Sequence, residues 1–206
     1  MDSSADPVSG AHREVGSRRI PAGQARTVVL RRRYDAPIDD VWDACCNPDR
    51  LSRWFVEITG DLRQGGTFSL EGIASGEILR CEPPRRLTVT WVYGDRPVDE
   101  VDLRLSPDGD GGTLFELEHA TVTRLVEWGG RMLDVVPGMG AGWEPALYAL
   151  DLHLRELLPD AVAAEWRKGA PPREVEELIT RSEKAWAALA EAADQAPGGD
   201  PAAGSC

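Results

Sequence analysis

Cysteine is scarce in this sequence, and its four copies form no recognisable framework. Cys45 and Cys46 are adjacent, Cys81 and Cys206 stand apart, and no CxxC pair occurs. This spacing argues against a disulfide scaffold and against a zinc site. We therefore expect no metal and no cofactor. Free thiols are typical of a reducing compartment, which favours a cytoplasmic protein.

Long apolar runs are also missing. No stretch approaches the roughly 20 residues that a membrane-spanning helix needs. The start, MDSSADPVSG, lacks the basic and then apolar order of a signal peptide. The net charge is −12, and the acidic excess lies in residues 35–158. Because an acidic body repels nucleic-acid phosphates and anionic lipids, we expect neither a nucleic acid nor a membrane as partner.

Composition separates the middle of the chain from its flanks. Residues 1–25 are rich in Ser, Gly, Ala, Pro and charge, which predicts a disordered leader, and residues 196–206 predict a disordered tail. Between them we expect one domain over 26–158 and a helical extension over 159–195. The main helix of this extension could dock on its own domain or pair with a second copy, so a homodimer is one of two alternatives.

The ordered part begins with a β-prone segment at 27–34. Apolar residues then recur at the spacing of one helical face: Ile38, Val41, Trp42 and Cys45. Pro48 ends that helix, because the residue before a proline avoids helical geometry. Residues 49–54 predict a second short helix. Two short helices are therefore expected directly after the first strand.

Strand-like segments follow. Apolar and polar residues alternate over 87–93, 101–105 and 113–119, which indicates an antiparallel sheet with one wet face. We expect about six or seven strands. The apolar face of the sheet needs a cover, and Trp143 with four leucines forms a stripe along a helix from about Gly142 to Leu158. The pattern predicts an α+β fold in which a curved antiparallel β-sheet wraps around a long C-terminal α-helix.

Several motifs occur in a fixed order along this region. They are APIDDVWDA at 36–44, LSRWF at 51–55, DLRQGGTF at 61–68, GEIL at 76–79, EPPRRL at 82–87 and GGTLFELEH at 111–119. Together they resemble the SRPBCC (START-like, Bet v 1-like) superfamily, and within it the branch similar to the activator of heat-shock-protein-90 ATPase. The resemblance covers roughly residues 26–158. It implies a helix-grip fold that commonly holds an apolar ligand between the sheet and the C-terminal helix.

The inward-facing strand residues and the long helix supply candidates for the wall of such a cavity. They are Phe68, Leu70, Val89, Trp91, Leu103, Phe115, Leu117, His119, Trp143, Leu147 and Leu150. The alternative for any one of them is ordinary core packing. Seven tryptophans would give wide, rigid walls suited to a flat ligand. His119 could orient a ligand or act as a general base, whereas a structural histidine with satisfied hydrogen bonds is the alternative.

Three functions follow from these observations. The first is binding of a hydrophobic or aromatic small molecule. The second is a polyketide cyclase/aromatase-like enzyme, and the third is a co-chaperone or stress-response interaction module. Catalytic residues stay unknown, because no clear acid–base set is visible, and this favours binding over catalysis. Residues 120–140 form a longer connection than the family pattern implies and could cap the cavity entrance or make a partner interface.

Overall fold

A computed structural model describes residues 10–167 and 172–195 of the chain. Its main feature is an eight-stranded antiparallel sheet in the order β1-β2-β8-β7-β6-β5-β4-β3. The strands are β1 (His12–Ile20), β2 (Gly23–Tyr34), β3 (Ile58–Gly60), β4 (Thr67–Leu70), β5 (Ala74–Glu82), β6 (Arg86–Trp91), β7 (Asp99–Pro107) and β8 (Thr113–Thr121). The helices are α1 (Ile38–Cys46), α2 (Pro48–Trp54), α3 (Val135–Leu154), α4 (Asp160–Arg167) and α5 (Arg173–Gln195).

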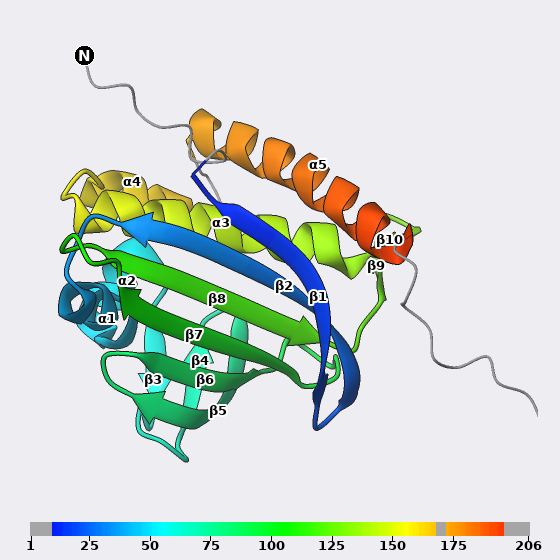
Figure 1. The fold of residues 1–206 in the computed structure, drawn as a ribbon, viewed down its shortest axis with the longest axis horizontal. Coiled ribbons are helices and arrows are strands. Elements are labelled where there is room, and N and C mark those ends of the chain that lie inside the picture. The colour runs from blue at the N-terminus through cyan, green and yellow to red at the C-terminus, as the bar shows by residue number, and fades with distance from the viewer. Residues whose placement is uncertain (1–9, 168–171, 196–206) are drawn as a thin grey trace, which may run out of the picture.

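The sheet, α3 and α5 form three successive layers (Figure 1). The sheet curves under α3, and α5 lies on the opposite side of α3. The predicted α+β helix-grip architecture is therefore confirmed, with α3 as the gripped helix. Within the described residues, none of the helices is long and apolar enough to cross a membrane.

Strand β1 lies where the sequence predicted a disordered leader. It pairs along its whole length with β2, from His12 opposite Arg31 to Ile20 opposite Gly23. The prediction is wrong for this segment because composition does not show that its arginines have partners. Arg18, for example, donates hydrogen bonds to carboxylates on β7 and β8. Residues 1–9 and the predicted tail at 196–206 lie outside the described residues.

Helices α1 and α2 close one end of the sheet (Figure 1). The sequence predicted both helices but placed them after the first strand, whereas they follow β2, because β1 was not predicted. Two acidic residues occupy the first turn of α1, where they favour the positive end of the helix dipole. Asn47 caps α2 by accepting a hydrogen bond from the backbone N–H of Asp49. The indole N–H of Trp54 donates to the carbonyl oxygen of Ala44 at 2.9 Å and ties the two helices together.

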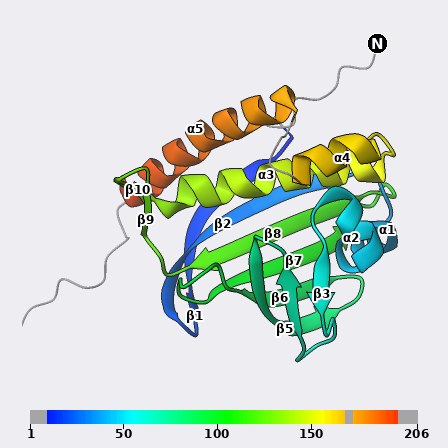
Figure 2. The ribbon, with the colours of Figure 1, turned by 180° about the vertical axis from the view of Figure 1, so that it is seen from behind.

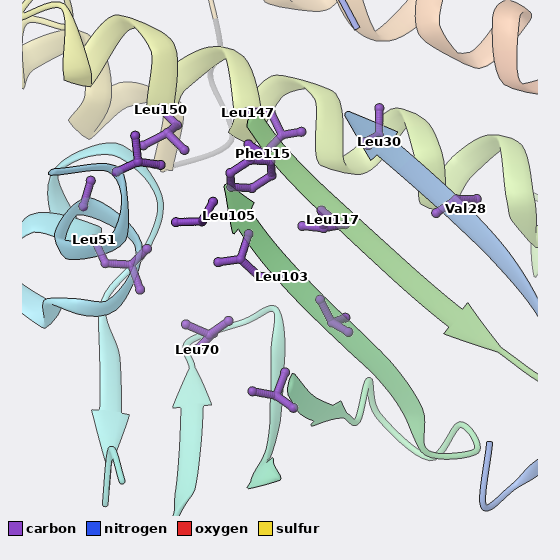
Figure 3. Close-up of a cluster of buried hydrophobic side chains, with 14 of the residues drawn as sticks. Val28, Leu30, Leu51, Leu70, Leu103, Leu105, Phe115, Leu117, Leu147 and Leu150 are labelled. Carbon is purple, nitrogen blue, oxygen red and sulfur yellow. The ribbon is translucent and has the colours of Figure 1, made fainter. Parts of the chain in front are cut away.

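The core lies between the concave face of the sheet and α3 (Figure 3). Leu30, Leu117 and Leu103 are opposite one another on β2, β8 and β7, so all three point to the same face, and all are buried. Residues one position along, such as Arg104 and Glu116, point to the other face and form ion pairs there. The alternation read from the sequence thus separates an apolar interior from a charged outer surface.

Helix α3 begins earlier and ends earlier than the sequence predicted. It runs over Val135–Leu154 rather than from about Gly142 to Leu158. The Asp134 side chain caps it by accepting a hydrogen bond from the N–H of Val136 at 2.8 Å. Two prolines and three glycines in its first eleven residues concealed this start, because they disfavour an isolated helix.

Helix α5 packs on its own domain. One stripe of α5 is buried within the chain and comprises Val175, Leu178, Ser182, Trp186 and Ala190. These residues face α3, and Trp186 belongs to the same apolar core as the sheet. The alternative of pairing with a second copy therefore has no support here, because the stripe that it would use is already covered.

Candidate ligand cavity

A cavity of about 140 Å³ lies inside the grip, between the sheet, α3 and the two short helices. All of its lining side chains are apolar, aromatic or thiol. They are Cys45, Leu51, Trp54, Phe55, Ile58, Phe68, Leu70, Ile78, Leu87, Val89, Trp91, Val101, Leu103, Phe115, Leu117, Trp143, Ala146 and Leu147. Such a wall offers a ligand dispersion contacts and ring stacking rather than charge.

The structure brings the sequence-predicted candidates together, with two exceptions. Leu150 is fully buried in the core but does not line the cavity, and His119 stands behind the wall. The other nine candidates line the cavity. Sequence reasoning missed nine of the eighteen lining residues, and two pairs among them differ in how visible they were. Leu87 and Val101 alternate in step with chosen neighbours and could have been found, whereas Phe55 and Ile58 follow α2 in a segment with no periodic signal.

Aromatic rings form a continuous arc along one side of the cavity. Ring centroids are 5.6 Å apart for Trp54 and Phe55, and 6.3 Å apart for Phe55 and Trp143. Trp143 lies 5.1 Å from Trp91, which in turn lies 6.3 Å from Phe68. These separations are within the range of favourable ring contacts. The arc therefore presents several rigid faces to whatever occupies the cavity.

His119 holds this arc in place from behind. Its Nδ1 accepts a hydrogen bond from the indole N–H of Trp143 at 3.1 Å, and its Nε2 lies 3.2 Å from a carboxylate oxygen of Asp99. An acceptor at Nδ1 requires the proton to be on Nε2, which then donates to Asp99. Both ring nitrogens are thus used within the protein. Of the two readings of His119, the geometry matches the structural histidine, because neither nitrogen is free to act on a ligand.

The cavity thiol is chemically quiet. Burial raises the pKa of Cys45 to about 12. Since the thiolate is the nucleophilic form of cysteine, a thiol with this pKa stays protonated and unreactive near neutral pH. Among the described residues, no three His, Cys, Asp or Glu side chains are grouped so that they could hold a metal ion.

A second hollow of the surface lies between α2 and the end of α3, and it is polar. Arg50 is its main charged group, but Asp40 and Asp43 already neutralise it at 2.7 and 3.0 Å. Burial, together with the charges of Arg50 and Arg53, lowers the pKa of His153 there. None of the residues that line this hollow also lines the cavity.

The long connection at 120–140 forms a β-hairpin of β9 (Leu125–Trp128) and β10 (Arg131–Asp134). In both views it lies beside the N-terminal end of α3 and the C-terminal end of α5 (Figures 1 and 2). None of its described side chains lines the cavity. Leu125, Met132 and Leu133 are instead exposed.

A curved antiparallel sheet that grips a long helix over an apolar cavity defines the START-like, helix-grip class of proteins. Within this class, the chain belongs to the family described as Activator of Hsp90 ATPase homolog 1-like protein, whose model matches residues 35–155. A comparison with curated proteins gives no match.

Solved structures agree with this assignment. The chain is similar to CalU16 from Micromonospora echinospora, with 46% identity and a TM-score of 0.72 to its crystal structure, over 88% of this chain and 98% of that one. The solution structure of CalU16 gives 47% identity and a TM-score of 0.75, over 88% and 96% of the two chains. PFC0360w, an HSP90 activator from Plasmodium falciparum, is 17% identical over 63% of this chain and 96% of that one, with a TM-score of 0.54. That last likeness concerns the fold alone.

Proposed function

We propose that this protein binds a hydrophobic, ring-containing small molecule in the cavity between α3 and the sheet. The observation that carries the proposal is the wall itself, whose lining side chains are all apolar, aromatic or thiol and include an arc of rings. A mostly apolar pocket with aromatic faces is the usual setting for a small-molecule site. Ordinary core packing would close such a space, because protein interiors are packed nearly as densely as crystals.

A neutral fluorescent probe tests this proposal directly. N-phenyl-1-naphthylamine brightens when it leaves water for an apolar site, and we expect saturable binding to the wild-type protein. The Ala146→Phe variant places a ring in the cavity from α3 and should weaken probe binding by about tenfold or more, because the added atoms take the space of the ligand.

The matched control is Leu114→Phe, which adds a ring on the outer face of the sheet, where Leu114 is exposed. It should bind the probe like the wild type. Equal binding by both variants would place the probe elsewhere on the surface and contradict the proposal. If the two variants differ as expected, native mass spectrometry of gently purified wild-type protein would identify a natural ligand by its added mass.

The cyclase-like alternative receives less support from the geometry. His119 uses both ring nitrogens within the protein, and the high pKa of Cys45 leaves the thiol protonated. A lining of this kind can shape a bound molecule but supplies no poised general base. Binding is therefore the function that the described residues support best.

The co-chaperone alternative rests on names alone. Activation of Hsp90 is stated of the family's namesake and of the P. falciparum protein, and the latter shares only the fold with this chain. A pull-down that recovers no chaperone would remove this alternative.

A cytoplasmic location remains part of our proposal and is consistent with the three described cysteines, which are all free thiols. Cell fractionation tests it.

A further inference from the structure

The cavity is small for the ligand that its walls suggest. An apolar cavity of about 150 Å³ accommodates a molecule the size of benzene, whereas sites for larger ligands occupy roughly 300–1,000 Å³. At about 140 Å³, the cavity has room for one ring. A ligand with fused or linked rings can lie wholly inside it only if part of the wall moves, and the structure indicates which part.

The first half of α3 is a poor helix by composition. Pro137, Gly138, Gly140 and Gly142 occur within six residues, and both residue types disfavour helix interiors. Pro145 lies inside the helix and has no N–H to donate to the carbonyl of Ala141. This segment therefore needs tertiary contacts to remain helical.

Helix α5 supplies these contacts. Trp186 is fully buried against α3, and a Cβ atom at Gly140 would overlap its indole ring. The missing side chain at Gly140 therefore leaves the space that the Trp186 ring occupies. The two helices make one of the largest contacts in the molecule, and Val136 of α3 is also fully buried.

A buried carboxylate fastens the same turn of α3. Glu144 is 2% exposed and accepts two hydrogen bonds from the guanidinium of Arg13, both at 2.6 Å. It also accepts one from the hydroxyl of Ser182 at 2.7 Å and one from the indole N–H of Trp186 at 2.8 Å. All three donor residues lie outside the family-matched region 35–155. Both flanks of the chain therefore meet on one carboxylate of the gripped helix.

An adjacent side of this turn faces the cavity. Trp143 immediately precedes Glu144 and belongs to the aromatic arc, while Ala146 and Leu147 complete the α3 wall. A displacement of this turn would therefore move the cavity wall together with Glu144 and its hydrogen bonds.

From this arrangement we infer that α5 is a strap: docked, it keeps the first half of α3 helical and the cavity narrow, and released, it lets the Trp143 wall move so that the cavity holds a ligand larger than one ring. The inference rests on the proposed function, because it concerns access to the same cavity. It goes further by assigning the chain's C-terminal helix a regulatory role.

A pair of glycine variants tests the strap. Gly140→Ala adds a methyl group against the indole of Trp186, whereas Gly142→Ala adds one at an exposed position with no atom within 4 Å. Both changes raise the intrinsic helix propensity of α3 equally. Any loosening seen only in Gly140→Ala must therefore come from lost α5 packing.

We expect hydrogen exchange of the amides in residues 135–146 to accelerate by about tenfold or more in Gly140→Ala and to stay unchanged or slow down in Gly142→Ala. The uptake rate of N-phenyl-1-naphthylamine should rise in Gly140→Ala alone. If Gly140→Ala proves too unstable to purify, Trp186→Phe keeps one aromatic ring but loses part of the buried indole and its N–H bond to Glu144, and a smaller acceleration is expected.

The result that would overturn the inference is faster exchange in α5 with α3 exchange and probe uptake both at wild-type values. That outcome would mean that α3 holds its shape without the strap. Failure of the proposed function looks different, since the probe would then bind to no variant or would bind equally to Ala146→Phe and Leu114→Phe. Hydrogen exchange of the α3 amides needs no ligand, so it tests the strap inference independently of the proposed function.

Discussion

At the scale of single residues, His119 shows how a plausible site residue acquires a different role. The sequence places it on the inward face of a strand, and the structure places it one layer behind the cavity wall, bonded to Trp143 and Asp99. It acts on the cavity through the indole that it orients. A histidine with both nitrogens occupied contributes fixed geometry rather than proton transfer.

This role makes a testable prediction. His119→Leu leaves the indole N–H of Trp143 without its acceptor, so we expect a loss of about 1–3 kcal/mol in the free energy of unfolding. The loss should appear in denaturant titrations followed by circular dichroism. In the same protein, probe affinity should fall because Trp143 is no longer held. His119→Gln, whose amide oxygen can still accept the bond, should lose less, and equal losses in the two variants would contradict the assignment.

At the scale of elements, the sequence predicted well what periodicity encodes. Alternation located β6, β7 and β8, and a 3.6-residue period located α1, since each of these elements buries one face. Strand β1 and the first half of α3 were missed for the opposite reason. Their stability comes from partners distant in sequence, such as Glu144 for Arg13 and Trp186 for Gly140. No local pattern carries that information.

The residues of the cavity wall also divide into those that sequence periodicity predicts and those that it does not. Predicted members on strands followed from alternation, as Val89 and Leu103 do, and those on α3 followed from its helical stripe. Members near the end of α2 did not, because Phe55 directly follows α2 and Ile58 begins β3, a strand of only three residues. Shape in such a segment is fixed by tertiary packing rather than by residue spacing.

The hairpin β9–β10 allows a test at this scale. Because none of its described side chains lines the cavity, Met132→Glu should change the free energy of unfolding by less than about 0.5 kcal/mol and leave probe affinity and uptake unaltered. Thermal denaturation and probe titration measure both. A marked change in probe uptake would instead indicate that the hairpin caps the cavity entrance, which is one of the two roles considered for residues 120–140.

At the scale of the whole molecule, the acidic surface is organised by arginines. On the outer face of the sheet, Asp102 accepts hydrogen bonds from Arg86 and Thr88 and pairs with Arg104, which also reaches Glu116. Burial by itself would raise the pKa of Asp102, but these hydrogen bonds and charges outweigh it, and the pKa is lowered. Glu116 is lowered in the same way, with Arg31 and Arg104 overcoming its burial.

The sign of the resulting pH dependence follows from linkage. A carboxylate whose pKa is lower in the folded state than its ordinary value, 3.8 for Asp102 and 4.5 for Glu116, stabilises the fold at higher pH. That contribution disappears as the pH falls through the folded-state values. We therefore expect Tm to hold near neutral pH and to decline once the pH drops below about 4.

Thermal scans by circular dichroism between neutral pH and pH 3 measure this decline. Asp102→Asn removes one of the two titrating groups and should make the decline shallower. A variant curve parallel to that of the wild type would show that other carboxylates are responsible.

The joining of both chain flanks at Glu144 also has a consequence for biosynthesis. Arg13 is made 131 residues before Glu144, and Trp186 is made 42 residues after it. A chain still attached to the ribosome can pair its strands and lay α3 across them, but it cannot complete the contacts of Glu144 until α5 has emerged. The contacts that hold the gripped helix at Glu144 are therefore completed only after every strand of the sheet has been synthesised.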